Sequence, residues 1–381
     1  MRVFQGRLPK DLPRETIFLD IADDDKVCDC CQGELHRIGE DTSERLDFVP
    51  AQLKVIETVR PKYACRACDQ SGTSVTIKQQ KPELSLIPKG IATPSLLSQI
   101  ITGKFQYSLP LYRQESLFKQ YGIELSRRTM SDWMQACSKA LQPLYDRLQN
   151  ILLEQPALHA DETTLNVIHE DRSSCYMWVY CSGSDSPRSS SIPNIVLYDF
   201  KQTRAGACAK AFLGDYAGYL HVDGYAAYNQ TKATLVGCWA HARRKLKESE
   251  HLQPKGKAGT ATVGLAKIQK LYAIESQAKQ LDTAEERYAF RQAHAPAALA
   301  DYKAWLDKNS LKKRPPKDKL TLAINYSLNQ WDNLARYIES ADLSIDNNRA
   351  ERAIKPFVIG RKNWLFANTA NGAQSSAVLY S

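Results

Sequence analysis

Two closely spaced pairs of cysteines constrain the fold of this chain more than any other feature of its sequence. The pairs follow a C-x2-C spacing and comprise Cys28, Cys31, Cys65 and Cys68. Such pairs can place four thiolates tetrahedrally around one Zn²⁺, with Zn–S bonds of about 2.3 Å. Cys30 is also present, but the two-residue spacing favours Cys28 and Cys31 as ligands. The sequence therefore predicts a zinc-binding module, whose zinc is structural because four thiolates leave no open coordination position.

The composition indicates a multidomain globular protein with a polyanionic partner. A chain of 381 residues predicts two to three domains at ~150 residues each. Lysine and arginine number 51 and aspartate and glutamate number 42, so the formal net charge is +9. The pI is near 8.9. This balance favours nucleic acid as the partner, and a mildly basic housekeeping protein is the alternative.

No segment of the sequence indicates insertion into a membrane or export. No stretch approaches the ~18 to 20 apolar residues of a membrane span, and residues 1–7 lack the apolar core of a secretory signal. Ten cysteines in a chain without such a signal are typical of a reducing compartment, where they bind metal more often than they form disulfides. We therefore expect a cytoplasmic, nucleoid-associated protein with no membrane partner.

The first half of the chain divides into three segments by composition. Residues 1–20 carry prolines and mixed charge, as linkers do, and residues 21–80 contain the paired cysteines. Within the second segment, the alternation of Leu53–Val59 predicts short strands. Residues 85–155 show helical spacing of apolar residues. Ser126–Trp133 predicts a turn leading into a helix, which is either a helix-turn-helix that touches DNA or the commoner plain helical connector.

The second half, residues 157–381, begins with strand-like segments and continues with helices. The candidate strands are Ala157–Asp161, Cys175–Cys181, Asn194–Asp199, Gly218–Asp223 and Ala233–Cys238. A helix is expected at Arg204–Phe212, and helical periodicity prevails at about 245–340. A short helix from Asp346 to Lys355 should follow and end at Pro356.

Three acidic residues stand out by their position in these segments. Asp161 and Asp223 each follow an apolar strand, and each has a histidine two residues before it. Carboxylates at the ends of adjacent strands lie at the mouth of a sheet and can hold a divalent metal ion. Glu351 is expected in the middle of the short helix, and Asp346 is expected to cap that helix. The simpler alternatives are turn or cap roles for the aspartates and an i, i+4 pair between Glu351 and Lys355.

Six stretches of the sequence carry a family resemblance. They are Cys28-x-x-Cys31 with Gly33-Glu34-Leu35, Arg60–Cys68, His159–Thr163, Val222–Tyr225, Gly237–Arg244 and Asp346–Arg352. In this order they resemble the transposase of the insertion sequence 66 family of bacterial mobile elements, over nearly the whole chain. The resemblance places Asp161, Asp223 and Glu351 in a catalytic triad.

The resemblance also implies the architecture. We expect an α+β multidomain protein in which a linker (1–20) and the zinc-binding module (21–80) precede a helical linker domain (85–155). Residues 157–381 are expected to form a ribonuclease H-like mixed α/β catalytic core of the DDE type. A helical insertion at about 245–340 should separate Asp223 from Glu351.

The implied activity is that of a DNA transposase, which cleaves DNA at the ends of its element and joins the 3′-hydroxyl to target DNA. Two Mg²⁺ ions would activate the attacking oxygen and stabilise the leaving oxygen. Expected partners are double-stranded DNA, further copies of the chain in a homo-oligomer, and small accessory proteins of the same element. The basic residues expected to neutralise DNA phosphates are Arg243, Arg244, Lys245, Arg349, Arg352, Arg361 and Lys362.

Cys238 and His241 form a further Cys-x-x-His pair, which resembles a signature near the start of such insertions. A packing or hydrogen-bonding role is expected for this pair over metal binding, and Trp239 between them is expected in the core.

Two departures from the family pattern keep other functions open. Members of the family usually begin with an extra helical segment, whereas Met1 lies close to the zinc module here. Ala373–Ser381 has the pattern of a helix without a stop signal, so a fragment or truncated copy is expected. The alternatives are a structure-specific nuclease on the same core, or a catalytically decayed zinc-containing protein that binds DNA as a repressor.

Overall fold

The computed structural model describes residues 53–64, 77–88, 90–170, 174–183, 193–252 and 259–381, together with isolated residues among the first 70. The chain divides into two compact units, Met1–Gln80 and Lys81–Ser381. In the first unit, β1 (Lys62–Ala64) pairs antiparallel with β2 (Ile77–Gln79). The four cysteines of the predicted zinc tetrad lie outside the described residues.

The prediction of a strand at Leu53–Val59 is wrong. All of these residues are exposed, Val55 to 91%. Alternation of apolar and polar residues produces a strand when one face is covered, and both faces of this segment are open in the described part of the chain.

Three helices begin the second unit: α2 (Pro94–Phe105), α3 (Leu111–Gln120) and α4 (Arg127–Leu153). Local chemistry sets where two of them begin, because the Thr93 hydroxyl accepts a bond from the Leu96 N–H and the Ser126 hydroxyl accepts one from the Thr129 N–H. Apolar side chains at helical spacing, among them Ile100 and Phe118, form a shared core. The predicted turn before α4 is therefore present, and its contact with DNA stays a prediction.

A five-stranded mixed sheet forms the centre of this unit. Its strands are β3 (Ala157–Leu165), β4 (Cys175–Cys181), β5 (Val196–Lys201), β6 (Tyr219–His221) and β7 (Thr234–Val236). The spatial order is β5-β4-β3-β6-β7, with antiparallel pairs from β5 to β3 and parallel pairs from β3 to β7. The predicted strands are confirmed, with ends that shift by a few residues.

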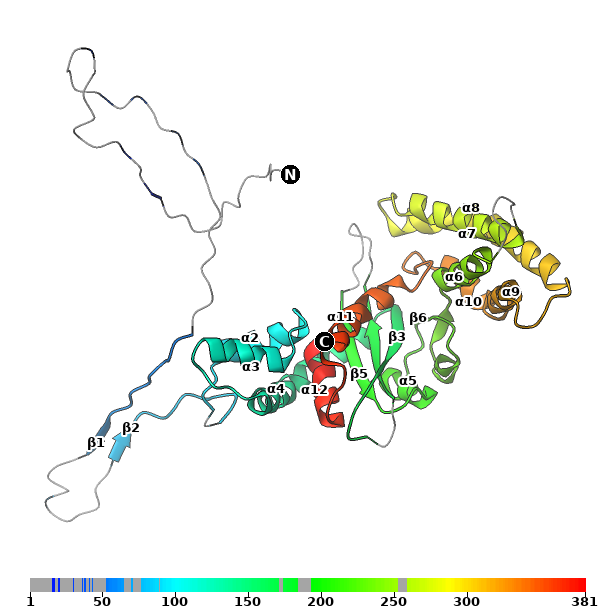
Figure 1. Ribbon diagram of the computed structural model, residues 1–381. Coiled ribbons are helices and arrows are strands. Elements are labelled where there is room, and N and C mark those ends of the chain that lie inside the picture. The colour runs from blue at the N-terminus through cyan, green and yellow to red at the C-terminus, as the bar shows by residue number, and fades with distance from the viewer. Residues whose placement is uncertain are drawn as a thin grey trace. The chain divides into compact units, whose positions relative to one another are not determined.

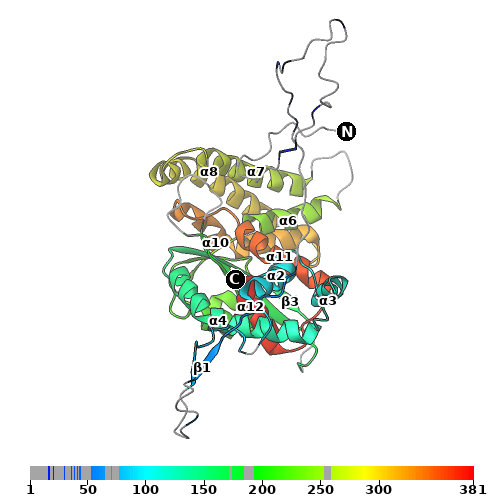
Figure 2. The same cartoon turned by 90° about the vertical axis from the view of Figure 1, so that its left-hand side faces the viewer.

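Helices cover both faces of this sheet (Figure 1 and Figure 2). One face packs Trp178 and Tyr180 against α4 and against α5 (Gly206–Leu213). The other face packs Met177 and Val179 against α11 (Asn348–Trp364) and α12 (Ala370–Tyr380). Because side chains alternate along a strand, consecutive residues of β4 supply the two cores.

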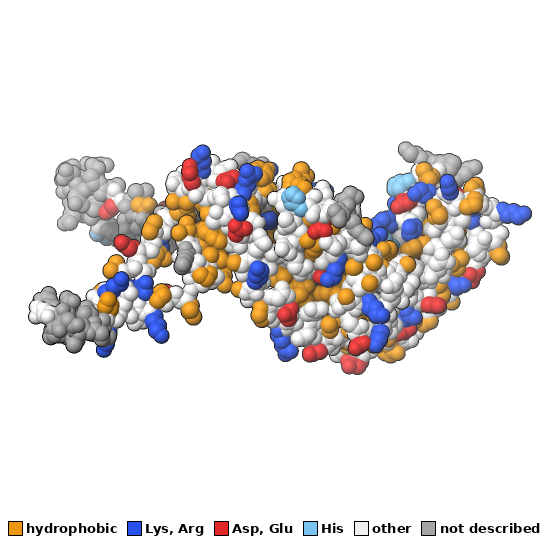
Figure 3. All heavy atoms as spheres, turned by 90° about the horizontal axis from the view of Figure 1, so that it is seen from below, with side chains coloured by type: hydrophobic (Ala, Val, Ile, Leu, Met, Phe, Trp, Pro, Cys, Tyr) orange, Lys and Arg blue, Asp and Glu red, His pale blue; other side chains and the backbone are white. Residues whose placement is uncertain are grey.

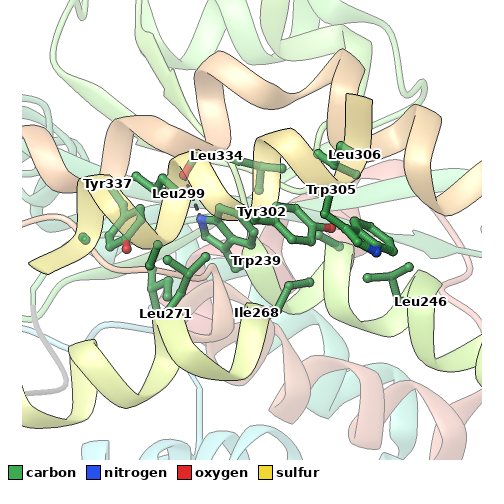
Figure 4. Packing of buried hydrophobic residues seen from close by; sticks show 14 of the residues in the cluster. Trp239, Leu246, Ile268, Leu271, Leu299, Tyr302, Trp305, Leu306, Leu334 and Tyr337 are labelled. Carbon is green, nitrogen blue, oxygen red and sulfur yellow. Dashed lines mark hydrogen bonds between the residues drawn. The ribbon is translucent and has the colours of Figure 1, made fainter. Parts of the chain in front are cut away.

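Most of the described residues between β7 and α11 form helices, which are α6 (Trp239–Glu250), α7 (Thr260–Ala278), α8 (Ala284–Ser310), α9 (Lys319–Asn329), α10 (Trp331–Ala335) and the 3₁₀ helix η3 (Arg336–Glu339). Figure 4 shows Trp239 at the centre of their core, close to Tyr302. The Trp239 indole N–H donates to the Leu334 carbonyl at 2.7 Å. Trp239 is fully buried, so its predicted place in the core is confirmed.

The prediction that a helix ends at Pro356 is wrong. Helix α11 continues through Pro356 to Trp364. Asn347 precedes its first residue, but Asp346 Oδ1 accepts the Asn348 N–H at 3.2 Å, so Asp346 bonds to the start of the helix as expected of a cap. Pro356 offers no N–H to the carbonyl four residues before it, and both residues are exposed on α11. Buried Ile354 and Phe357 on either side hold the helix on the sheet.

The described surface mixes charges of both signs with apolar side chains. Figure 3 shows apolar side chains gathered over the region of α2 to α4, and Tyr112, Leu117, Leu141 and Leu144 are exposed there. No helix within the described residues is long and apolar enough to cross a membrane.

Candidate active site

Two aspartates lie side by side because of the register of two parallel strands. His159 of β3 pairs with His221 of β6, so Asp161 and Asp223 each follow a paired residue by two positions. Residues two apart on a strand point to the same face. We predicted that this strand ends at Asp161. It continues instead to Leu165, because its polar second half still pairs with β4. Asp223 lies in the turn after β6, where its Oδ1 accepts the Tyr225 N–H at 2.8 Å.

A pair of stacked histidines lies before the aspartates. The rings of His159 and His221 are buried, with centroids 4.3 Å apart and planes 10° apart. Burial, with the nearby His159 and Arg291, holds the pKa of His221 well below its usual value. Its Nε2 accepts the Ser344 N–H at 3.3 Å, which a neutral ring can do. The matching His-x-Asp spacing in the two strands is the sequence signal for this pair.

Asn347 connects the segments that carry the acidic residues. Its Nδ2 donates to the Ala160 carbonyl at 2.8 Å, its Oδ1 lies 2.9 Å from His159 Nδ1, and its backbone N–H donates to Cys238 Sγ at 3.2 Å. The residue is 1% exposed. Sequence reasoning missed Asn347, whose only signal was its place beside Asp346 in the final matching stretch.

Glu351 lies in the first turn of α11, close to the aspartates, although we expected it in the middle of a helix. Its Oε1 lies 3.6 Å from His241 Nδ1, and Arg244 Nη2 lies 3.3 Å from its Oε2. Burial, together with the negative charges of Glu162, Asp223 and Glu351, raises the pKa of Asp161 to about 7. The structure thus brings the three predicted acidic residues within electrostatic reach of one another.

Glu162 points to the opposite face of β3 from Asp161. Its carboxylate accepts the Arg204 Nε–H at 2.9 Å and the Tyr228 hydroxyl at 2.6 Å. Burial raises the pKa of Glu162, and these two partners act against the rise. Glu162 is therefore fixed as an internal ion-pair partner, separate from the three clustered carboxylates.

Cys238 and His241 lie at the start of α6, beside Glu351. Cys238 is fully buried, and burial raises its pKa to about 12. The expected hydrogen-bonding role of Cys238 is present in its contact with the Asn347 N–H. The Sγ of Cys238, a ring nitrogen of His241 and a carboxylate oxygen of Glu351 lie within 4.8 Å of one another.

A cationic pocket of about 440 Å³ opens beside Glu351. Its lining residues are Ala240, Arg243, Arg244, Lys247, Gln269, Tyr272, Asp346 and Asn348. Arg243 and Arg244 were predicted to contact phosphates, whereas Lys247 was not, although it follows them by one helical turn. The pocket places positive charge next to the acidic cluster.

Three of the other predicted phosphate contacts have partners inside the protein. Arg349 donates to the Ser182 carbonyl, Arg361 donates to Thr163 and Thr164, and Lys245 Nζ lies 4.9 Å above the Tyr326 ring. These contacts give the three residues a structural role. Arg352 and Lys362 are exposed on α11, and Arg352 also has a partner in the protein.

Two family models match this sequence. Residues 89–375 match the model described as transposase IS66 family. Residues 25–69, which include the four paired cysteines, match the zinc-finger binding domain of transposase IS66.

Relatives in Sinorhizobium fredii are similar over most of the chain. The uncharacterized protein y4jD is 36% identical over 99% of this chain and 74% of its own length. The uncharacterized protein y4qI is 35% identical over 94% of this chain and 67% of its own length. The uncharacterized protein y4hP is 32% identical over 97% of this chain and 68% of its own length.

Proposed function

Because the chain belongs to the IS66 family of transposases, we propose that it cleaves DNA at the ends of a mobile element and transfers the 3′ ends into target DNA. The observation that carries this proposal is the clustering of Asp161, Asp223 and Glu351. Asp161 lies on β3, Asp223 follows the adjacent strand β6, and Glu351 lies on a distant helix. Burial raises the pKa of Asp161 to about 7, with contributions from Glu162 and from the charges of Asp223 and Glu351.

The chemistry of the cluster fits divalent magnesium. Three carboxylates supply the oxygen ligands that Mg²⁺ takes, and their repulsion is relieved when a cation neutralises them. Bound Mg²⁺ would activate the attacking oxygen and stabilise the leaving oxygen of an in-line displacement. Asp161, Asp223 and Glu351 are the residues that would hold it.

The surrounding residues hold these carboxylates in place. The Glu162 N–H donates to Asp161 Oδ1 at 2.9 Å, and the Tyr225 N–H donates to Asp223 Oδ1. Each of these bonds leaves the second carboxylate oxygen for a ligand. Asn347 fixes the start of α11 to β3 and thereby sets the position of Glu351.

The strand order supports a ribonuclease H-like core. In this sheet β5, β4 and β3 are antiparallel, and β6 and β7 run parallel to β3. Asp161 lies on β3, Asp223 directly follows β6, and helices cover both faces. This is the arrangement expected of a ribonuclease H-like core. We assign residues 157–381 to this core, with the helical insertion at about 245–340. Residues 85–155 form the proposed helical domain, and residues 1–20 the proposed linker.

The cationic pocket supports DNA binding next to the acidic cluster. Arg243, Arg244 and Lys247 present positive charge there, so affinity for double-stranded DNA should fall as salt rises. We propose element ends and target DNA as the substrates, a homo-oligomer as the working form on the nucleoid in the cytoplasm, and small accessory proteins of the element as partners.

The zinc-finger match supports bound zinc in the N-terminal module. We propose that the four paired cysteines, all within residues 25–69, are its ligands. Four thiolates hold zinc for folding, without an open position for catalysis.

Strand transfer on labelled element ends tests the function. Asp161→Asn, Asp223→Asn and Glu351→Gln should each lower cleavage and joining by at least ~10³-fold, while DNA affinity is kept. Asp215→Asn, an exposed residue paired with Lys232, is the matched control and should act as wild type. Joining at the wild-type rate by Asp161→Asn would overturn the proposal. Cutting without joining would identify a nuclease, and binding without cutting would identify a repressor.

A further inference from the structure

Cys238, His241 and Glu351 bring three different metal-ligating groups together at the starts of two helices. Cys238 precedes α6, His241 lies in its first turn, and Glu351 lies in the first turn of α11. One ligand atom from each residue lies within 4.8 Å of the other two. This cluster borders the acidic triad, but the oxygen-only chemistry of that triad uses neither the thiol nor the imidazole.

The imidazole of His241 lacks a hydrogen bond on the side that faces the cluster. Its Nδ1 is buried and has no hydrogen-bond partner among the described residues. The distance of 3.6 Å from Nδ1 to Glu351 Oε1 is too long for a hydrogen bond. It is close to the separation of ~3.3 Å between two ligands bonded to one zinc ion at ~2.0–2.1 Å.

One contact of the Cys238 thiol favours the thiolate form that binds metal and acts against the rise in pKa caused by burial. Cys238 Sγ is fully buried and accepts the Asn347 backbone N–H at 3.2 Å. A hydrogen bond from a backbone N–H to sulfur orients a ligand and stabilises a thiolate. Asn347 also bonds to β3, so Cys238 is aligned with the helix that carries Glu351.

We propose that Cys238, His241 and Glu351 form a binding site for a thiophilic divalent cation such as Zn²⁺, separate from the cysteine tetrad and from the magnesium site. A thiolate, an imidazole and a carboxylate are a ligand set that zinc accepts and Mg²⁺ does not. Three protein ligands leave a fourth position open for water. On binding, the Cys238 thiol releases its proton to solvent.

Arg244 is the group that the cation displaces. Its guanidinium lies 3.3 Å from Glu351 Oε2, and its Nη1 lies 3.2 Å from His241 Nε2. Ligation through Nδ1 places the imidazole proton on Nε2, so Arg244 loses its contact with His241, and the cation replaces Arg244 in neutralising Glu351. The Arg244 side chain is 53% exposed and can turn toward the cationic pocket, which it already lines.

Because the proposed thiophilic cation and the magnesium site both use Glu351, we expect the thiophilic cation to inhibit strand transfer. A carboxylate drawn toward Cys238 and His241 is no longer free to complete the magnesium site. This consequence rests on the proposed function, whereas binding of the cation does not.

Cobalt binding to the full chain, with zinc already loaded in the tetrad, tests the site. Added Co²⁺ should give the wild-type chain the charge-transfer absorption of one cobalt–thiolate bond, which Co²⁺ held by carboxylates alone does not show. Cys238→Ser should abolish that absorption. His241→Gln keeps the thiol and should weaken Co²⁺ binding by at least ~10-fold, since even outer-shell changes cost 10–100-fold. Thermal melting identifies any variant that has not folded.

Absence of Co²⁺ binding to wild type, or the same absorption in folded Cys238→Ser, would overturn the site. Exposed Cys30→Ser is the matched control and should keep the absorption.

Zinc inhibition tests the sharing of Glu351. Strand transfer in excess Mg²⁺ is measured with and without added Zn²⁺, and each variant is compared with itself. Wild type should lose at least ~10-fold of its rate, as for an essential metal ligand, while Cys238→Ser should keep most of its own rate. Equal inhibition of wild type and Cys238→Ser by Zn²⁺ would overturn the proposed competition between the two cations for Glu351. No joining by any form at any zinc concentration would instead count against the proposed function, and the cobalt result would stand.

Discussion

The rings of His159 and His221 stack 4.3 Å apart on the two strands that carry Asp161 and Asp223. Their two anchors lie close together in the sequence: Asn347 contacts His159, and Ser344 contacts His221. The segment before α11 is therefore fastened to the same two strands that bear the aspartates. This arrangement explains how Glu351, far along the chain, is held beside them.

Loss of the Asn347 side chain should lower stability and weaken the metal site together. Asn347→Ala removes the buried hydrogen bonds that Asn347 makes to the Ala160 carbonyl and the His159 ring, which costs ~1–3 kcal/mol. We expect a lower Tm and a higher Mg²⁺ requirement for strand transfer, because Glu351 loses its fixed position. Asn348→Ala, which alters only a bond to Asp346, is the control. An unchanged Mg²⁺ requirement in Asn347→Ala would argue against this role.

The ion pair between Arg291 and Glu275 should be essential for the fold of the insertion. The pair is almost fully buried at 2.7 Å, and Arg291 also donates to the Ser340 and Leu343 carbonyls. Glu275→Gln leaves a buried guanidinium charge uncompensated and should cost about 3–5 kcal/mol. Chemical denaturation measures the loss.

The exposed pair Lys232–Asp215 provides the comparison for Glu275→Gln. Asp215→Asn should change stability by less than ~1 kcal/mol, because water screens that pair. A similar small loss for Glu275→Gln would show that the buried pair contributes little.

Lys104 should make stability depend on pH in the alkaline range. Burial lowers its pKa to about 8, against 10.5 when it is free in solution. Between these values the unfolded chain binds the proton and the folded chain does not, so stability rises with pH from about 8 to 10.5. Below pH 8 the folded protein bears the full cost of the buried charge.

Lys104→Met should remove that cost. At pH 7 we expect stabilisation on the order of 1 kcal/mol, because the loss of cation–π contacts with Phe105 and Trp364 offsets part of the gain. The difference in Tm between variant and wild type should shrink from pH 8 to 10. A difference that stays constant over this range would contradict the assignment.

Cys65→Ser should remove the zinc of the N-terminal module and unfold that module. In small metal modules the free energy of zinc binding supplies the free energy of folding, so loss of the metal unfolds the module. Metal analysis and proteolysis of residues 21–80 measure the two effects. Cys30→Ser is the matched control, because Cys30 is adjacent to a proposed ligand but exposed, and it should keep the zinc. Zinc retained by Cys65→Ser would exclude Cys65 as a ligand.

The sequence determined most of the local structure of the described chain. Strands β3 to β7 appear where apolar runs predicted them, and the caps at Thr93 and Ser126 begin helices as local chemistry requires. The repeated His-x-Asp spacing marked both aspartates. These features are readable because alternation, helical spacing and capping each depend on residues close in sequence.

The errors arose where packing overrides local preference. Pro356 remains inside α11 because Ile354 and Phe357 hold the helix on the sheet. Leu53–Val59 alternates without forming a strand because no part of the chain that the structure describes covers either of its faces. A sequence pattern specifies which residues can be buried, whereas the tertiary structure decides whether a partner covers them.

Only the tertiary structure decided which distant groups share a site. It placed Glu351 beside Asp161 and Asp223, committed Arg349 and Arg361 to internal contacts, and joined Cys238 and His241 to Glu351. The sequence identified each of these residues, but it did not predict which residues lie next to them in space. Contacts between residues a hundred or more positions apart follow from strand register and helix packing, and no local pattern encodes those distances.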